Sequence, residues 1–145
     1  MARIKIELPE IFPFTTNIPV RITDLNYGGH VGNDTVLSII HEARMQFLKT
    51  AGYTELNIEG ISLIMSDVSI EFKNELFYGD IIKASVASGD FSRAAFSLYY
   101  KLEKMSADKI VLVTVAKTGM VCYNYESKKI SSLPEQARIK LGGNG

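Results

Sequence analysis

The residues of this chain best suited to chemistry lie in one short stretch that carries acids, an amide and an imidazole: Asp24-Leu-Asn26-Tyr-Gly-Gly29-His30-Val-Gly32-Asn33-Asp34. Its glycines allow a ligand to approach the backbone closely. A carboxylate or an imidazole placed here could accept a proton from water, and an amide could hold that water in position. The stretch is therefore the first candidate for a site that activates water.

A predicted helix follows this stretch directly. Asn33 or Asp34 is suited to the N-cap, and Gly52 to the C-terminal stop. Between them, apolar residues recur at helical spacing: Val36, Ile39, Ile40, Ala43 and Phe47. The first N–H groups of a helix are unpaired and carry partial positive charge. They could polarise a carbonyl oxygen on which negative charge develops, as in acyl transfer.

The same residues also fit a purely structural interpretation. A glycine-rich turn would use Asp34 as a helix cap, with Asp24 and Asn26 hydrogen-bonded to their own backbone. Farther along the helix, Asp34, Ser38 and His41 are predicted to share one face. Such a polar stripe either lines a cavity or forms the exposed side of the helix. His41 fits a structural or interface histidine better than a catalyst.

The rest of the pattern predicts strands around that helix. One strand is expected over 14–22, and one further helical turn over 53–58. Alternating apolar and β-branched residues then predict later strands at 61–72, 81–87, 91–102 and 109–123. One long helix followed by antiparallel strands predicts the α+β class, with the helix packed on one face of a curved sheet.

Composition and charge exclude several partners and sites. Because 16 Lys and Arg residues balance 16 Asp and Glu residues, no overall field favours nucleic acid, and a bound anion would need a local basic cluster. No run reaches the ~18–20 apolar residues that cross a bilayer, so no membrane insertion is expected. Two histidines and the single cysteine, Cys122, lack metal-ligand spacing, and no nucleotide-binding loop is present. These features predict a cytoplasmic protein with no metal and no resident cofactor.

A longer pattern links the motifs from Pro19 to Leu48. It runs through Val20-Arg21, then Asp24-Leu-Asn26-Tyr-Gly-Gly29-His30-Val31-Gly-Asn33, then Glu42-Ala43-Arg44. This order and spacing resemble hotdog-fold thioesterases of the hydroxybenzoyl-CoA thioesterase type, whose pattern is V-R, D-x-D-x-x-G-H-V-x-N and E-A-R. Later stretches are similar to the same family, at Phe77-Tyr-Gly79-Asp80, Lys128-Lys129 and Leu133-Pro134-Glu135. The resemblance covers nearly the whole chain and is more specific for the fold than for a substrate.

The resemblance implies a hotdog fold, in which a curved antiparallel sheet of about five strands wraps a long central helix. It implies one thioesterase-like domain over 1–141. The remaining residues, 142–145, have no apolar side chain, so a flexible tail is expected there. Two subunits of the family join edge to edge, so a homodimer or a homotetramer is expected, with active sites at the dimer interface. The implied reaction is hydrolysis of an acyl-CoA thioester to the free acid and CoA, where CoA is part of the substrate.

The resemblance also implies roles for particular residues. The backbone of Gly29, Gly32 and Asn33 would hold the thioester oxygen, and Arg93 with Lys129 or its neighbour Lys128 would meet CoA phosphate. The acyl tunnel would be lined by those side chains that point inward among Leu63, Met65, Val68, Phe72 and Tyr99. A one-residue error of register would reverse that list.

The sequence departs from the family at Asn26, which stands where many members have the reactive carboxylate. An amide can orient water but cannot accept its proton. Asn26, His30 and Asp34 are therefore the candidate catalytic residues, with Asp34 or His30 taking the proton and Asp24 or Glu42 as further acids. Two alternatives stay open: a non-catalytic module that binds or senses acyl thioesters, and a thioesterase that acts on acyl carrier protein.

Overall fold

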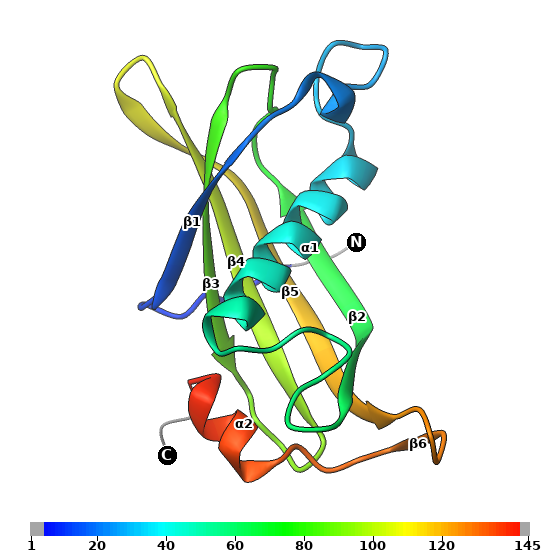
Figure 1. The fold of residues 1–145 in the computed structure, drawn as a ribbon. Coiled ribbons are helices and arrows are strands. Elements are labelled where there is room, and N and C mark those ends of the chain that lie inside the picture. The colour runs from blue at the N-terminus through cyan, green and yellow to red at the C-terminus, as the bar shows by residue number, and fades with distance from the viewer. Residues whose placement is uncertain (1–4, 143–145) are drawn as a thin grey trace.

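The computed structural model describes residues 5–142, and it shows one antiparallel sheet wrapped around a helix (Figure 1). The sheet has six strands in the order β1-β3-β4-β5-β2, and the short β6 pairs with β5. The strands are β1 (Phe14–Pro19), β2 (Ser62–Phe72), β3 (Ile81–Gly89), β4 (Ala95–Ser106), β5 (Lys109–Asn124) and β6 (Lys129–Ile130). The predicted α+β class is confirmed, with six strands where about five were expected. Residues 143–145 of the expected tail lie outside the described residues.

The central helix α1 (Asn33–Thr50) crosses the concave face of the sheet. It has 18 residues, which corresponds to ~27 Å. Fully buried α1 side chains such as Ile40 and Leu48 pack in one core with Val86 and Leu98 of the sheet. A second short helix, α2 (Glu135–Lys140), closes the lower end of the molecule (Figure 1).

The helix begins one residue away from the predicted cap. Gly32 is the N-cap, with φ −73° and ψ 158°, and its carbonyl accepts the N–H groups of Thr35 and Val36 at 3.1 Å. Asn33 and Asp34 are thus the first helical residues, so the expectation that either one caps the helix was wrong. At the other end Gly52 adopts φ 81° just past the helix, as the sequence predicted.

Two predicted strand boundaries and one predicted helical turn were also wrong. The first strand stops at Pro19, because the backbone N–H of Arg21 donates to the Asp24 carboxylate at 2.8 Å and folds 22–24 into a 3₁₀ turn. The segment 53–58 forms turns instead of a helical turn, and Ile58 bridges to Ile61. Strand β4 starts at Ala95 instead of Phe91, because the N–H of Ser92 turns back to the carbonyl of Ala95 at 2.8 Å.

A bulge in β2 decides which of its side chains face the helix. Met65 pairs with Met120 and Asp67 with Gly119, so Ser66 is an extra residue opposite β5. The bulge keeps apolar residues on the inner face along both halves of the strand: Leu63 and Met65 before it, Val68, Ile70 and Phe72 after it. Tyr99 of β4 lies on the outer face, where its hydroxyl donates to Asp90. The candidate tunnel residues therefore point inward, except for Tyr99.

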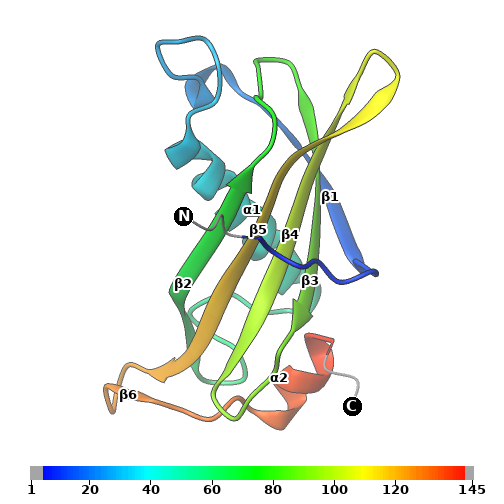
Figure 2. The ribbon, with the colours of Figure 1, turned by 180° about the vertical axis from the view of Figure 1, so that it is seen from behind.

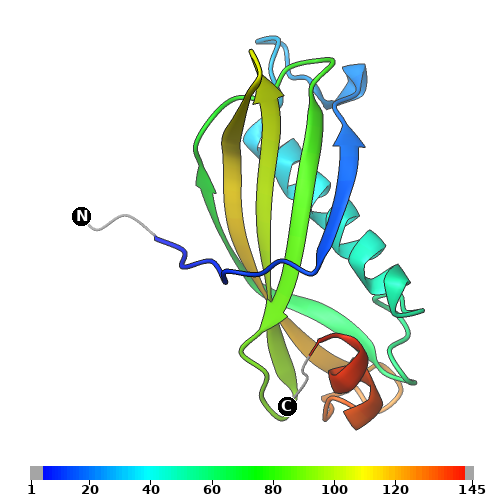
Figure 3. The ribbon, with the colours of Figure 1, turned by 90° about the vertical axis from the view of Figure 1, so that its left-hand side faces the viewer.

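The outer face of the sheet is crossed by the N-terminal segment, residues 5–13, which passes over β5, β4 and β3 (Figures 2 and 3). The Ile6 N–H donates to the Glu71 carboxylate at 2.8 Å, and the Lys101 ammonium lies 4.9 Å from the centre of the Phe12 ring. Val115 faces outward yet is only 4% exposed, which shows how closely this segment covers the sheet.

Candidate active site

The loop before α1 is closed by its own backbone and by Asn26. The Asn26 N–H donates to the His30 carbonyl at 2.9 Å, and Leu25 bridges to Val31. The Asn26 side-chain oxygen accepts the Gly28 N–H at 2.8 Å. This contact is the local hydrogen bond of the structural interpretation. The side-chain nitrogen Nδ2 of Asn26, in contrast, donates to no group within residues 5–142.

Asp34 and Asn26 meet above Gly32. A Cβ built on Gly32 would lie 2.7 Å from Asp34 Oδ1 and 3.6 Å from Asn26 Nδ2. A carboxylate oxygen and an amide nitrogen thus face the same small volume, which stays open because residue 32 has no side chain. An acceptor and a donor placed in this way can hold one water molecule between them.

The start of α1 supplies unpaired donors beside that volume. Within residues 5–142 no side chain caps the helix, and the N–H groups of Asn33 and Asp34 have no acceptor. The dipole of an 18-residue helix adds partial positive charge at this end. Together these groups could stabilise an oxyanion, provided that it lies near Gly32.

His30 lies at the edge of the same loop and has an acidic neighbour that the sequence did not reveal. Its Nδ1 lies 3.2 Å from the Val31 carbonyl, and its Nε2 lies 4.0 Å from the carboxylate of Glu75. The Val31 N–H donates to the Leu76 carbonyl at 2.9 Å, which holds the 73–80 segment against the loop. Glu75 is far from His30 in sequence, so no motif could have paired them.

The two further candidate acids, Asp24 and Glu42, are hydrogen-bonded to other residues. Asp24 is buried, and although burial raises its pKa, hydrogen bonds from Arg21 hold the pKa below its usual range. Glu42 accepts the Gln46 side-chain amide at 2.7 Å. It lines a cavity of about 300 Å³ between β1 and α1, together with Ser38. Neither acid is directed at the volume over Gly32.

The predicted polar stripe of Asp34, Ser38 and His41 lies on the exposed side of α1, where all three residues are exposed. Of the two interpretations of this stripe, the exposed side of the helix is therefore confirmed. Within the stripe, Ser38 lines the cavity beside β1, and His41 contacts Glu55 at 2.7 Å.

The structure places the predicted CoA-binding residues far from the loop. Arg93 follows β3 and donates to Ser132 at 2.7 Å. Lys129 lies in β6, which pairs with the same end of β5 as the first residues of β2 do. The loop lies beyond the other end of β2, and ten residue steps of a strand span ~33 Å. Within one chain, Arg93 and Lys129 are therefore not brought together with Asn26, His30 and Asp34.

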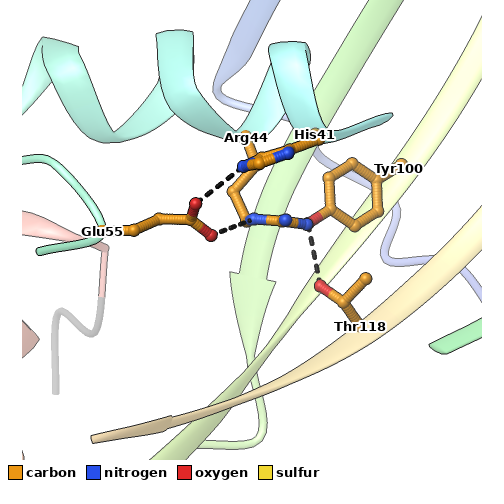
Figure 4. Close-up of polar contacts among 5 residues, drawn as sticks. All are labelled: His41, Arg44, Glu55, Tyr100 and Thr118. Carbon is orange, nitrogen blue, oxygen red and sulfur yellow. Dashed lines mark hydrogen bonds and ion pairs between the residues drawn. The ribbon is translucent and has the colours of Figure 1, made fainter. Parts of the chain in front are cut away.

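A buried polar network lies farther along α1 and was not predicted from the sequence (Figure 4). Glu55 accepts hydrogen bonds from His41 at 2.7 Å and from Arg44 at 2.8 Å. Arg44 also donates to the Tyr100 hydroxyl at 3.3 Å, and that hydroxyl lies 2.8 Å from Thr118. The sequence signal was the E-A-R motif, but its partner Glu55 comes from the next loop.

The described part of the chain has neither a metal-binding cluster nor a membrane-spanning helix. Residues 5–142 contain no group of three or more His, Cys, Asp or Glu side chains arranged to hold a metal ion. Over the same residues, no helix has the length and apolar character needed to cross a membrane.

Comparison with known proteins places this fold and loop in a family. The sequence model of the thioesterase-like superfamily matches residues 20–141. The 1,4-dihydroxy-2-naphthoyl-CoA hydrolase of Microcystis aeruginosa is 30% identical over 129 residues, which are 85% of this chain and 88% of that protein.

Solved structures agree. A 1,4-dihydroxy-2-naphthoyl-CoA thioesterase from Synechocystis superposes with a TM-score of 0.78 at 23% identity, covering 88% of this chain and 94% of that one. A 4-hydroxybenzoyl-CoA thioesterase variant in complex with 4-hydroxybenzoyl-CoA gives a TM-score of 0.79 at 14% identity. The superposition covers 89% of this chain and 98% of that one. These likenesses confirm the hotdog fold. The chain belongs to the thioesterase-like superfamily.

Proposed function

We propose that the chain hydrolyses an acyl-CoA thioester to the free acid and CoA, and that an aromatic acyl group is the first class to test. The observation that carries this proposal is the meeting of Asp34 and Asn26 above Gly32, beside the free N–H groups of α1. Similar proteins act on, or bind, 1,4-dihydroxy-2-naphthoyl-CoA and 4-hydroxybenzoyl-CoA.

In the proposed reaction the thioester oxygen accepts the N–H groups of Asn33 and Asp34. Asn26 Nδ2 donates to a water molecule, and the Asp34 carboxylate accepts a proton from that water as its oxygen attacks the carbonyl carbon. The C–S bond of the tetrahedral intermediate then breaks, and the sulfur of CoA leaves with the proton returned by Asp34. Asp34 thereby supplies the basic group that Asn26 lacks.

The acyl group lies, in this proposal, along the inner face of β2. Phe72 and Val68 point toward the helix side but remain 47% and 37% exposed, although both are apolar. Phe72 ends β2 near the start of α1, and Val68 lies two levels farther down the strand, beyond Ile70. An acyl group held here would cover apolar surface that this chain leaves open.

A second copy is needed to bring the basic residues to the site. Among the strands of residues 5–142, β2 pairs only with β5. At the start of its other edge the Leu63 N–H donates to the Glu55 carbonyl at 2.7 Å, and the rest of that edge has no strand partner and is available for an antiparallel β2–β2 contact. A two-fold axis through that contact would set Arg93 and Lys129 of one copy beside the Asn26–Asp34 loop of the other. We therefore propose a homodimer as the unit that binds CoA, with a tetramer as a pair of such dimers.

The direct test follows the release of the CoA thiol from short, medium, long and aromatic acyl-CoAs. Asp34→Asn is expected to lower kcat by a factor on the order of 10² or more, since it removes the proton acceptor. Glu42→Gln is the matched control, because this acid of the same helix is bonded to Gln46, and it should retain parental turnover.

Two other outcomes would assign the base or the function differently. Loss of turnover in His30→Gln but not in Asp34→Asn would move the base to His30. An inactive parent that gains turnover on Asn26→Asp would identify a binding module in place of an enzyme.

A further inference from the structure

The network around Glu55 ties an exposed histidine to the core (Figure 4). Arg44 and Tyr100 are buried, at 4% and 0% exposure, whereas the His41 side chain is 53% exposed. Burial alone would raise the pKa of Glu55, but its bonds with His41 and Arg44 lower it, so Glu55 is a carboxylate near neutral pH. Arg44 already compensates that charge, and the His41 contact is an additional one.

The contacts leave one nitrogen of His41 free. His41 Nε2 faces one oxygen of Glu55 at 2.7 Å, and Arg44 occupies the other oxygen at 2.8 Å. A nitrogen that donates to a carboxylate carries the proton, so the second nitrogen of a neutral ring is an acceptor. Nδ1 of His41 has no partner within residues 5–142, and Glu55 fixes the ring that presents it.

His41 belongs to the network that borders the proposed acyl position. It follows Asp34 by about two turns of α1, which is ~10 Å along the helix. Val68 pairs with Thr118, which ends the network on the side of the sheet, and Phe72 lies two strand levels nearer the loop. An acyl group that runs from the start of α1 past Phe72 toward Val68 therefore reaches the level of the network, in which His41 is the most exposed side chain.

We infer that His41, oriented by Glu55, is a specificity-determining residue whose Nδ1 accepts a hydrogen bond from a hydroxyl group at the far end of an aromatic acyl group. The inference rests on the proposed function and deepens it. It assigns to this chain a residue that distinguishes a hydroxylated ring from an unsubstituted one, as a site built to bind a hydroxyl rejects the analogue that lacks it.

The test compares kcat/KM for 4-hydroxybenzoyl-CoA and benzoyl-CoA in the parent and in His41→Leu. The ratio of the two values is expected to fall about 10-fold in His41→Leu, because kcat/KM for 4-hydroxybenzoyl-CoA falls more than kcat/KM for benzoyl-CoA. His41→Gln keeps an amide donor for Glu55 and an oxygen acceptor, so it should restore part of the ratio. Equal losses on both substrates, or a parental ratio near one, would overturn the inference.

A binding measurement separates this inference from the hydrolysis itself. The chain has two histidines, so the imidazole nitrogens of His41 can be followed by ¹⁵N NMR, with His30→Gln for assignment. In Asp34→Asn, 4-hydroxybenzoyl-CoA should shift the Nδ1 signal of His41 and benzoyl-CoA should not. If the shift occurs but the parent shows no turnover, the proposed hydrolysis fails and the recognition by His41 stands. If turnover occurs without the shift, the assignment of His41 fails alone.

Discussion

The carboxylate of Asp34 lies directly over Gly32, so closely that a methyl group at Gly32 would come within 2.7 Å of Asp34 Oδ1. Gly32 has φ −73°, which any residue can adopt, so the glycine is required here by space and not by backbone conformation. Any side chain at this position must move the carboxylate of Asp34 away from Asn26.

Gly32→Ala is therefore expected to lose activity while keeping its fold. We expect kcat to fall by a factor on the order of 10², because Asp34 is displaced from the water it should hold. The matched control is Gly29→Ala. The Gly29 N–H donates to the Asn26 carbonyl at 3.1 Å, so the prediction that it holds the thioester oxygen was wrong. Its φ is 85°, and no atom lies within 4 Å of the new Cβ. Strain there should cost about 1 kcal/mol of stability and leave activity near parental. Equal activity losses in both variants would argue against the role of Asp34.

Glu55→Gln tests the buried network through stability. Arg44, with 5% of its side chain exposed, would lose its charged partner, and we expect a loss of about 2 kcal/mol in the free energy of unfolding at pH 7. Glu135→Gln is the control, since that acid is 78% exposed in its pair with Arg138 and should cost under ~0.5 kcal/mol. Urea unfolding of the parent, Glu55→Gln and Glu135→Gln measures both losses of stability. Similar losses in the two variants would contradict the stabilising role of Glu55.

The pair of Glu55 and Arg44 also predicts how the free energy of unfolding depends on pH. The pKa of Glu55 is lower in the folded protein than its ordinary value of 4.5, so the folded state favours the charged form. Its contribution to stability is present above pH 4.5 and is lost as the pH falls through the folded pKa. The difference between parent and Glu55→Gln should therefore shrink below pH 4.5, and a difference that stays constant down to pH 3 would refute this.

Cys122 should be unreactive in the native protein. It is 0% exposed, and burial raises the pKa of its thiol to about 11, although Arg138 opposes that shift. A thiol reagent at pH 8 is expected to label no cysteine in the folded chain and one per chain in urea. The CoA-release assay would then carry no signal from the protein. Labelling at equal rates in both states would show that the thiol is accessible.

Mixed dimers test whether each site is built from two copies. Asp34→Asn lacks the proposed base, and a double variant, Arg93→Ala with Lys129→Ala, lacks the proposed phosphate contacts. Each should be weakly active alone. Refolding them together in equal amounts should restore about a quarter of parental activity, because half of the dimers would contain one intact site. No recovery would mean that the basic residues do not serve the loop of another copy.

The elements of the fold were largely predictable, because α1 and the long strands show clear apolar periodicity. Segment 53–58 was mistaken for a helical turn because its conformation depends on distant contacts, such as that of Glu55 with Arg44. Local propensity cannot report such contacts. Likewise, the extra residue Ser66 keeps both halves of β2 facing the helix, and alternation alone gives no sign of where a bulge lies.

The candidate site was predictable only where its residues are neighbours in sequence. Asn26, Gly32 and Asp34 belong to one stretch, so their convergence follows from a single loop and helix start. Glu75 approaches His30 only because the 73–80 segment packs on that loop. Arg93 matched a family position, but no motif states at which end of the sheet a residue lies.

The N-terminal segment limits how copies of this protein can assemble. One face of the sheet carries α1, and residues 5–13 cross the other, so a second sheet cannot lie flat on either face. The edge strand β1 has 6 residues and ends in a proline, whereas the opposite edge, β2, has 11. Pairing through β2 uses up that longer edge in both copies at once. Such a contact closes on itself, and the pair carries no long strand onto which a fibre could grow.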